Sequence, residues 1–211
     1  MGRRVGATVV IVRSLPTHGE EIFLTFDDGP EAGSTEAVLD LLAAKDVRAT
    51  FFLISQKAAR RPDLVERIRE GRHAIGNHSP DHAYRNFFKP ARAIREWIER
   101  AEQDFSTLGV HDVVGFRPPA GVVNRHLQIA AGQMNLPVIL WNERFYDVVV
   151  PWGPRRARAS AARLTGGSIV LLHDRVRPAR VESFCSTLGG YIDQLRARGF
   201  RFSPLERGMF G

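Results

Sequence analysis

The segment Ile22-Phe-Leu-Thr-Phe-Asp-Asp-Gly-Pro30 is the clearest structural signal in this sequence of 211 residues. Its first five residues are apolar, β-branched or aromatic, which predicts a short buried strand at 22–26. A Gly-Pro pair, which is typical of turns, follows immediately after two acids. We therefore expect Asp27 and Asp28 to lie at the C-terminal end of a buried strand.

Strands and helices alternate along the rest of the chain. This alternation predicts an α/β fold with a parallel sheet, and about seven strand–helix units are enough to close a barrel. We expect one domain over 1–211, with its core at about 22–205. The other predicted strands are 48–54, 73–77, 113–116, 138–141, 168–172 and 200–203, and the predicted helices are 35–44, 63–70, 90–108, 124–134, 155–164 and 181–198.

The chain is basic, with 30 Lys and Arg against 23 Asp and Glu and a formal net charge of +7. Clustered cations of this kind can bind nucleic acid through its phosphates. Here the arginines are spread along the chain among acids, and the densest groups, at 155–158 and 175–180, are short. We therefore expect no nucleic-acid partner.

Cys185 is the single cysteine, so the chain can form neither an intrachain disulfide nor a cysteine zinc cluster. Any metal must be held by histidines and carboxylates. No apolar window approaches the roughly 18 residues of a membrane helix, so we expect no membrane span. The apolar run at 7–12 is too short for the core of a signal peptide, which predicts a cytoplasmic chain unless an export signal has been removed.

Two groups of polar residues suggest metal chemistry. The side chains of Asp27 and Asp28 diverge, so one can bind a cation while the other faces a water molecule. His78 and His82 are four residues apart, which suits two ligands of one ion if the segment turns. Taken separately, the acids also fit a solvated turn, and the histidine pair also fits chance. Together they make a two-His, one-Asp set that leaves coordination positions open for water and substrate.

Four short motifs give the chain a family resemblance. In order they are Thr-Phe-Asp-Asp-Gly-Pro at 25–30, His-Ser-Pro-Asp-His at 78–82, Arg-Pro-Pro at 117–119 and Leu-Leu-His-Asp at 171–174. With them the chain resembles the polysaccharide deacetylases of carbohydrate esterase family 4, which share the homology domain of the nodulation-factor chitooligosaccharide deacetylase. The resemblance covers about 23–174 and implies a distorted (β/α) barrel with about seven parallel strands.

The resemblance also implies an activity, the metal-dependent removal of N-acetyl groups from an amino sugar in a poly- or oligosaccharide. Asp28, His78 and His82 would hold the divalent ion, most simply Zn²⁺, with Co²⁺ or another divalent ion as alternatives. Asp27 would be the general base that activates water for attack on the acetamide. The expected partner is an N-acetylated carbohydrate, and the oligomeric state is left open.

Further roles follow from the later motifs. By the resemblance, His173 would protonate the departing amine, Arg117 would orient the general base, and Asp147 would pair with His173. The backbone N–H of Ala120 would stabilise the oxyanion, with Pro119 beside it on the substrate side of the site. Read without the family, Arg117 also fits a surface arginine, Asp147 a loop acid and His173 a strand-end histidine.

The sequence departs from the family pattern around the substrate. Ala120 stands where the family usually has tyrosine. Counted from the tryptophan at 141, the first acid of the fourth motif falls on Arg144, the second on Asp147, and the expected tryptophan on Val148. We expect Trp152 to replace that aromatic from a different place, and a misalignment of Asp147 is the alternative.

These departures leave more than one function open. Arg144, Arg175 and Arg177 lie close in sequence to the altered positions and could meet an anionic substrate, or could form a solvated rim. A second possibility keeps the site but changes the substrate, to deformylation or deacetylation of a lipid-linked or other non-polymeric amide. A third is a carbohydrate-binding protein whose catalytic site has decayed.

Overall fold

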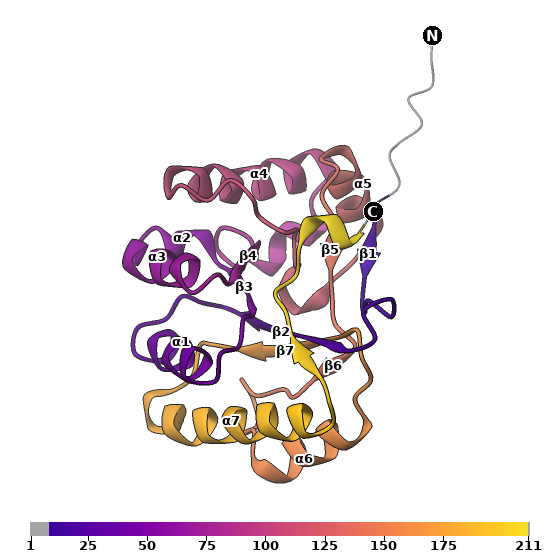
Figure 1. Ribbon diagram of the computed structural model, residues 1–211. Coiled ribbons are helices and arrows are strands. Elements are labelled where there is room, and N and C mark those ends of the chain that lie inside the picture. The colour runs from indigo at the N-terminus through magenta and orange to yellow at the C-terminus, as the bar shows by residue number, and fades with distance from the viewer. Residues whose placement is uncertain (1–8, 211) are drawn as a thin grey trace.

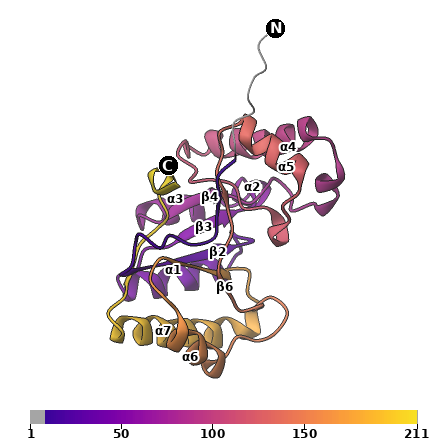
Figure 2. The same ribbon diagram turned by 90° about the vertical axis from the view of Figure 1, so that its right-hand side faces the viewer.

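The computed structural model of the protein describes residues 9–210, and its strands lie between two groups of helices (Figures 1 and 2). Helices α4 and α5 lie on one side and α6 and α7 on the other in both views. The strands are β1 (Ile11–Val12), β2 (Glu21–Asp27), β3 (Thr50–Leu53), β4 (Ala74–Asn77), β5 (Val138–Ile139), β6 (Glu143–Arg144), β7 (Ser168–His173) and β8 (Arg201–Phe202). The α-helices are α1 (Ser34–Ala44), α2 (Ser55–Ala58), α3 (Pro62–Glu70), α4 (Ala91–Thr107), α5 (Arg125–Gln133), α6 (Pro154–Arg163) and α7 (Val181–Ala197).

Strand β2 is the centre of a parallel sheet with the order β4-β3-β2-β7-β6, and β8 also pairs with β2. Successive side chains of a strand face opposite sides. Leu24 and Phe26 therefore pack in the large core cluster with residues of α1 and α7. Phe23 joins a separate cluster with β3 and β7. The same alternation puts Asp27 on the face of Phe23, which is the inner face of the sheet.

Single bridges close the sheet into a distorted barrel. Phe116 bridges Asn77 of β4 and Val138 of β5, β5 pairs with β1, and Ser14 bridges Ser168 of β7. All pairings between the named strands are parallel. The predicted parallel α/β fold is confirmed, and the pairings run in a ring.

The predicted strand at 113–116 is wrong as a regular element. Only Phe116 pairs with both neighbours, so its ladder is one residue long. The Val114 N–H still donates to the Ile75 carbonyl at 2.9 Å, so the segment fills the position of a strand without forming one. The sequence analysis did not predict β1, β6 and the single-turn helix α2.

The six predicted helices are confirmed within two residues at each end. Helix α4 shows why, because its buried residues recur at helical spacing, with Ile94, Trp97, Ile98, Ala101 and Phe105 on one face. Between residues 9 and 210, no helix combines the length and the apolar character needed to cross a membrane. The expectation of a cytoplasmic chain rested on the N-terminal segment, most of which lies outside the described residues.

Candidate active site

The two acids of the first motif stand at the C-terminal end of β2. Asp27 is 3% exposed and Asp28 8% exposed, and Asp28 has a left-handed backbone with φ of 75°. The turn that follows is packed against the last motif, because a Cβ on Gly29 would lie 2.1 Å from Oδ2 of Asp174. The Thr35 hydroxyl donates to this Oδ2 at 2.6 Å. Burial raises the pKa of Asp174 to about 7.

The two histidines lie on the loop that follows β4. The Asn77 side chain begins this loop, accepting from the Ser79 N–H at 2.8 Å and donating to Glu102 of α4 at 2.6 Å. The Ser79 hydroxyl accepts from the His82 N–H at 3.0 Å. Ser79 and His82 both have positive φ, so the loop turns sharply enough to direct both imidazoles to the same point. Helix α4 and the Asn77 side chain thus hold the loop in shape.

The side chains of Asp28, His78 and His82 form a set that could hold a metal ion, with one ligand atom from each within 4.8 Å of the others. Asp28 Oδ1 lies 3.5 Å from His78 Nε2 and 3.3 Å from His82 Nε2. Ligands about 2.0–2.2 Å from a tetrahedral Zn²⁺ stand about 3.4 Å apart, so these separations fit such an ion. The three residues expected as metal ligands are therefore together in space.

Protonation states at this set also suit a metal. Nδ1 of His78 lies 2.8 Å from the Arg117 carbonyl, which can only accept, so Nδ1 carries the proton and Nε2 offers its lone pair. Burial lowers the pKa of His82 and favours its neutral form. Burial alone would raise the pKa of Asp28, but the neighbouring histidines hold it well below its ordinary range. Neutral imidazoles and a carboxylate are the ligand forms that metals bind.

Arg117 is buried and binds one carboxylate oxygen of Asp27. Its side chain is 0% exposed, and Nη1 donates to Asp27 Oδ1 at 2.8 Å and to the Thr25 hydroxyl at 2.7 Å. Nε and Nη2 donate to the carbonyls of Ile139 and Leu140 at 3.1 and 3.0 Å. Five N–H groups on a rigid fork allow this many partners at once. Asp27 Oδ2 stays on the side of the metal set, 3.8 Å from His78 Nε2.

His173 reaches the site from the C-terminal end of β7, whose residue 173 is in register with Asp27 of β2. Asp147 binds it twice, since Oδ1 lies 2.9 Å from His173 Nδ1 and Oδ2 accepts from the His173 N–H at 2.9 Å. Burial opposes the charged imidazolium, but the hydrogen bond and charge of Asp147, with help from Asp27 and Asp28, raise the pKa of His173 to about 9. His173 is therefore mostly protonated near pH 7.

Asp27, His173 and the three residues that could hold a metal ion line one pocket of about 270 Å³. Sequence reasoning missed three of its aromatic side chains, those of Tyr84, Trp141 and Tyr146. Tyr84 packs edge-on against the His82 ring at 5.1 Å and is 51% exposed. Its place two residues after the second histidine could have identified it. The full lining is Asp27, Asp28, His78, His82, Tyr84, Ala120, Trp141, Arg144, Tyr146, Val148, Val149, Leu171 and His173.

The positions that depart from the family pattern differ in whether they line this pocket. Ala120 lines the pocket in a left-handed backbone conformation with φ of 54°. Pro119 was expected beside it on the substrate side, but it is buried and does not line the pocket. Val148 also lines the pocket and is 42% exposed. Arg144 lines it as well, donates to the Tyr146 hydroxyl, and places its guanidinium carbon 4.0 Å from the centre of that ring.

Trp152 requires a correction. It was expected to replace a missing aromatic of the sugar site, but it is 5% exposed and its ring lies 4.6 Å from the Phe145 ring and 5.5 Å from the Tyr191 ring. It belongs to the large core cluster beneath α7, because an indole so close to these apolar rings is removed from water. The expectation that Trp152 contacts substrate is wrong.

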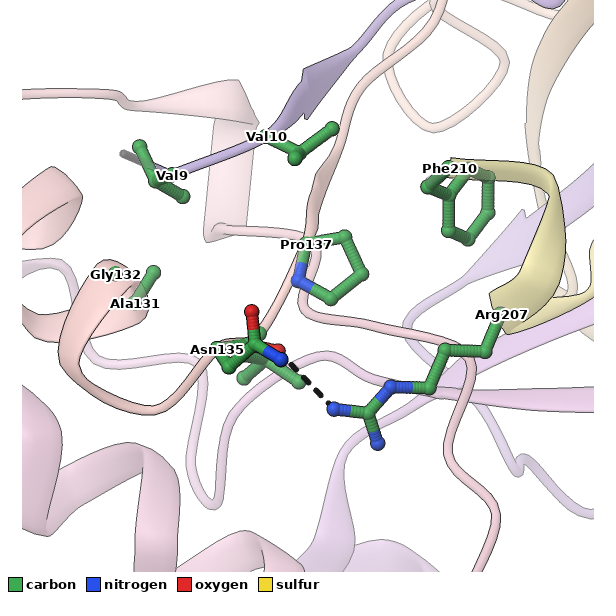
Figure 3. Close-up of a pocket in the computed structure, with 9 residues that line it drawn as sticks. Val9, Val10, Ala131, Gly132, Asn135, Pro137, Arg207 and Phe210 are labelled. Carbon is green, nitrogen blue, oxygen red and sulfur yellow. Dashed lines mark hydrogen bonds between the residues drawn. The ribbon is translucent and has the colours of Figure 1, made fainter. Parts of the chain in front are cut away.

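A separate cavity of about 180 Å³ lies near the N-terminal ends of β1 and β5 (Figure 3). Val9, Val10, Pro137 and Phe210 line it, and Arg207 donates to the Asn135 carbonyl at 3.1 Å. The residues discussed above lie at the C-terminal strand ends, which is the opposite end of a parallel barrel. This cavity therefore has no part in the candidate site.

Comparison with known proteins gives one family. A family model described as polysaccharide deacetylase matches residues 14–139. The peptidoglycan-N-acetylglucosamine deacetylase PgdA of Listeria monocytogenes is 31% identical over 191 residues, which cover 89% of this chain and 38% of that protein. A chitooligosaccharide deacetylase of Bradyrhizobium is 29% identical over 88% of this chain and 89% of its own length.

A solved structure agrees with these matches. The peptidoglycan N-acetylglucosamine deacetylase Bc1960 superposes with a TM-score of 0.84 and 28% identity, over 95% of this chain and 92% of that one. The predicted (β/α) barrel is confirmed by this similarity. The chain spans less than half the length of the Listeria relative.

Proposed function

Because this chain belongs to the polysaccharide deacetylase family, we propose that it is a hydrolase of carbon–nitrogen bonds that removes N-acetyl groups from an amino sugar in a poly- or oligosaccharide. The observation that carries the proposal is the placement of Asp27. Its Oδ1 is held by Arg117 at 2.8 Å, and its Oδ2 faces the set of three metal-binding side chains. A carboxylate that can act as base, the acid His173 and the three side chains that could hold a metal ion then share one pocket with room for a substrate group.

We infer that Asp28, His78 and His82 hold a divalent ion, with Zn²⁺ the best fit to two imidazoles and one carboxylate. When bound, such an ion supplies Lewis acidity, which polarises the acetamide carbonyl and makes water a stronger nucleophile at neutral pH. The rest of the chemistry belongs to the side chains around it.

Asp27 acts as the general base. Its carboxylate takes a proton from water as the oxygen attacks the carbonyl carbon, and Arg117 keeps Oδ2 aimed into the pocket while that happens. The backbone N–H of Ala120 donates to the carbonyl oxygen as negative charge develops there. This donor does not depend on the side chain, so the change from tyrosine to alanine leaves it intact.

His173 acts as the general acid. Amines leave poorly unless protonated, and the Asp147 pair keeps His173 in the form that can donate, with a pKa of about 9. Its proton passes to the sugar nitrogen as the carbon–nitrogen bond breaks, which yields acetate and a free amine. The complete set of groups does not favour a carbohydrate-binding protein without activity.

The test is acetate release from a panel of N-acetylated oligosaccharides, with the protein treated with chelator and then reloaded with Zn²⁺. We expect turnover to need the metal and about one ion per chain to be bound. Asp27→Asn should lower kcat by about 100-fold or more while its metal content stays at the wild-type level. Unchanged turnover after chelation, or no acetate from any substrate by the loaded protein, would refute the proposal. Release of formate from an N-formylated analogue, with no acetate from the acetylated one, would show that the protein removes formyl rather than acetyl groups.

A further inference from the structure

A cavity of about 340 Å³ adjoins the catalytic pocket and is lined by three arginines, Arg175, Arg177 and Arg180. It shares Val148 with the catalytic pocket. Asp147, which holds His173 at 2.9 Å, also lines it. A group bound in this arginine cavity would therefore lie next to His173.

The arginine cavity has an excess of positive charge. Its two acids are already engaged, Asp147 with His173 and Glu31 with Lys57 at 2.8 Å. Within residues 9–210, none of the three guanidinium groups forms an ion pair or a side-chain hydrogen bond. Three guanidinium groups thus line one concavity without ion-pair partners of their own, and Arg175 and Arg177 are exposed, so an anion from solvent can reach them.

A further cavity, of about 350 Å³, shares Arg175 with the arginine cavity and shares Asp28 and His82 with the catalytic pocket. It has mixed charge, because Lys57 and Arg60 line it together with the acids Glu31 and Asp81. Lys57 is held by Glu31 and by the Asp28 carbonyl, to which it donates at 2.9 Å. Arg175 therefore stands between the arginine cavity and the ligands of the metal set.

We propose that the arginine cavity binds an anionic group, a carboxylate or a phosphate, carried by the substrate next to the acetamido sugar that is deacetylated. This inference rests on the proposed function, since it places the acetamide in the catalytic pocket. Guanidinium groups bind both oxyanions through paired N–H donors, and a neutral sugar would leave the three arginines without partners. The concave shape beside the catalytic groups favours a substrate group over a nucleic acid, which would need a long exposed basic surface.

The experiment uses the metal-loaded chain and the double variant Arg175→Gln/Arg177→Gln. Three N-acetylglucosamine oligomers of equal length serve as substrates: one neutral, one with a carboxylate on the neighbouring sugar, and one with a phosphate there. We expect the double variant to lose at least about tenfold in kcat/KM on an anionic oligomer, mostly through KM, and little on the neutral one. The two anionic oligomers show which oxyanion the cavity prefers. The control is Arg155→Gln/Arg158→Gln, which removes the same charge from exposed positions of α6.

Equal losses on neutral and anionic oligomers, or a wild-type preference for the neutral one, would overturn the inference while leaving the proposed function intact. If the loaded protein releases no acetate at all, the proposed function fails and calorimetry on the same oligomers decides the inference separately. Tighter binding of an anionic oligomer that the double variant weakens would support it. The inference would be overturned by equal affinity for the neutral and anionic oligomers. It would also be overturned if the double variant lost only retention on DNA.

Discussion

Replacing Asp147 by asparagine should remove most of the rise in the pKa of His173. The wild-type pair raises the pKa of His173 from the ordinary 6.5 to about 9 although burial opposes the charged form. That difference corresponds to about 3 kcal/mol favouring the imidazolium, at about 1.4 kcal/mol for each pH unit. Asparagine has no charge and a single acceptor oxygen, so it can keep only one of the two hydrogen bonds that Asp147 makes at 2.9 Å. We expect the pKa of His173 to fall by on the order of two pH units.

The pKa is measurable by NMR titration of the imidazole resonances in the metal-free protein. The kinetic consequence has a definite sign, because the acid must be protonated to work. Activity is lost as pH rises through the pKa of His173, so the basic limb of kcat/KM should move to lower pH in Asp147→Asn. Glu31→Gln is a matched control, since Glu31 pairs with Lys57 at 2.8 Å and is not among the acids that raise the pKa of His173. A basic limb at the same pH in Asp147→Asn and wild type, with an unchanged pKa of His173, would refute the reasoning.

Three further changes test the packing around the site. Arg117→Lys keeps the charge but cannot serve all four acceptors of the buried guanidinium, so we expect a loss of about 2–3 kcal/mol in urea unfolding and a lower kcat; wild-type stability and rate would contradict this. Gly29→Ala should destabilise by about 1–3 kcal/mol because its Cβ would lie 2.1 Å from Asp174, whereas Gly153→Ala, with no atom within 4 Å, should not; equal melting temperatures would count against it. Trp152→Ala should cost about 3–5 kcal/mol of stability with KM unchanged, and a raised KM at full stability would return this tryptophan to the substrate site.

Prediction of the fold succeeded where local pattern and burial agree. The helix at 90–108 was predicted from its amphipathic spacing, and α4 covers Ala91–Thr107. The strand at 22–26 was predicted from its apolar run, and β2 covers Glu21–Asp27. The segment at 113–116 has the same local character, but whether it forms a ladder depends on how far its neighbours run beside it, which lies outside its own sequence.

Prediction of the candidate site also succeeded for some residues and failed for others. Asp28, His78 and His82 were expected together from their motifs, and one atom of each lies within 4.8 Å of the others. Trp152 was misplaced because an aromatic side chain in a loop has the same sequence signal whether it faces a pocket or a core. Only packing against Phe145 at 4.6 Å distinguishes the two.

The residue types and their order along the chain were enough to predict an α/β fold with a parallel sheet, a two-His, one-Asp set and a second carboxylate beside it. This works because strand alternation and parallel topology bring residues at the C-terminal strand ends to one place, however far apart they lie in sequence. Which charges are neutralised depended on tertiary structure alone. Distances across the fold pair Asp147 with His173 at 2.9 Å and Glu31 with Lys57 at 2.8 Å, and leave Arg175, Arg177 and Arg180 without counter-charges in the described part of the chain. Electrostatic partners are set by separations of a few ångströms, and neither composition nor spacing along the chain contains them.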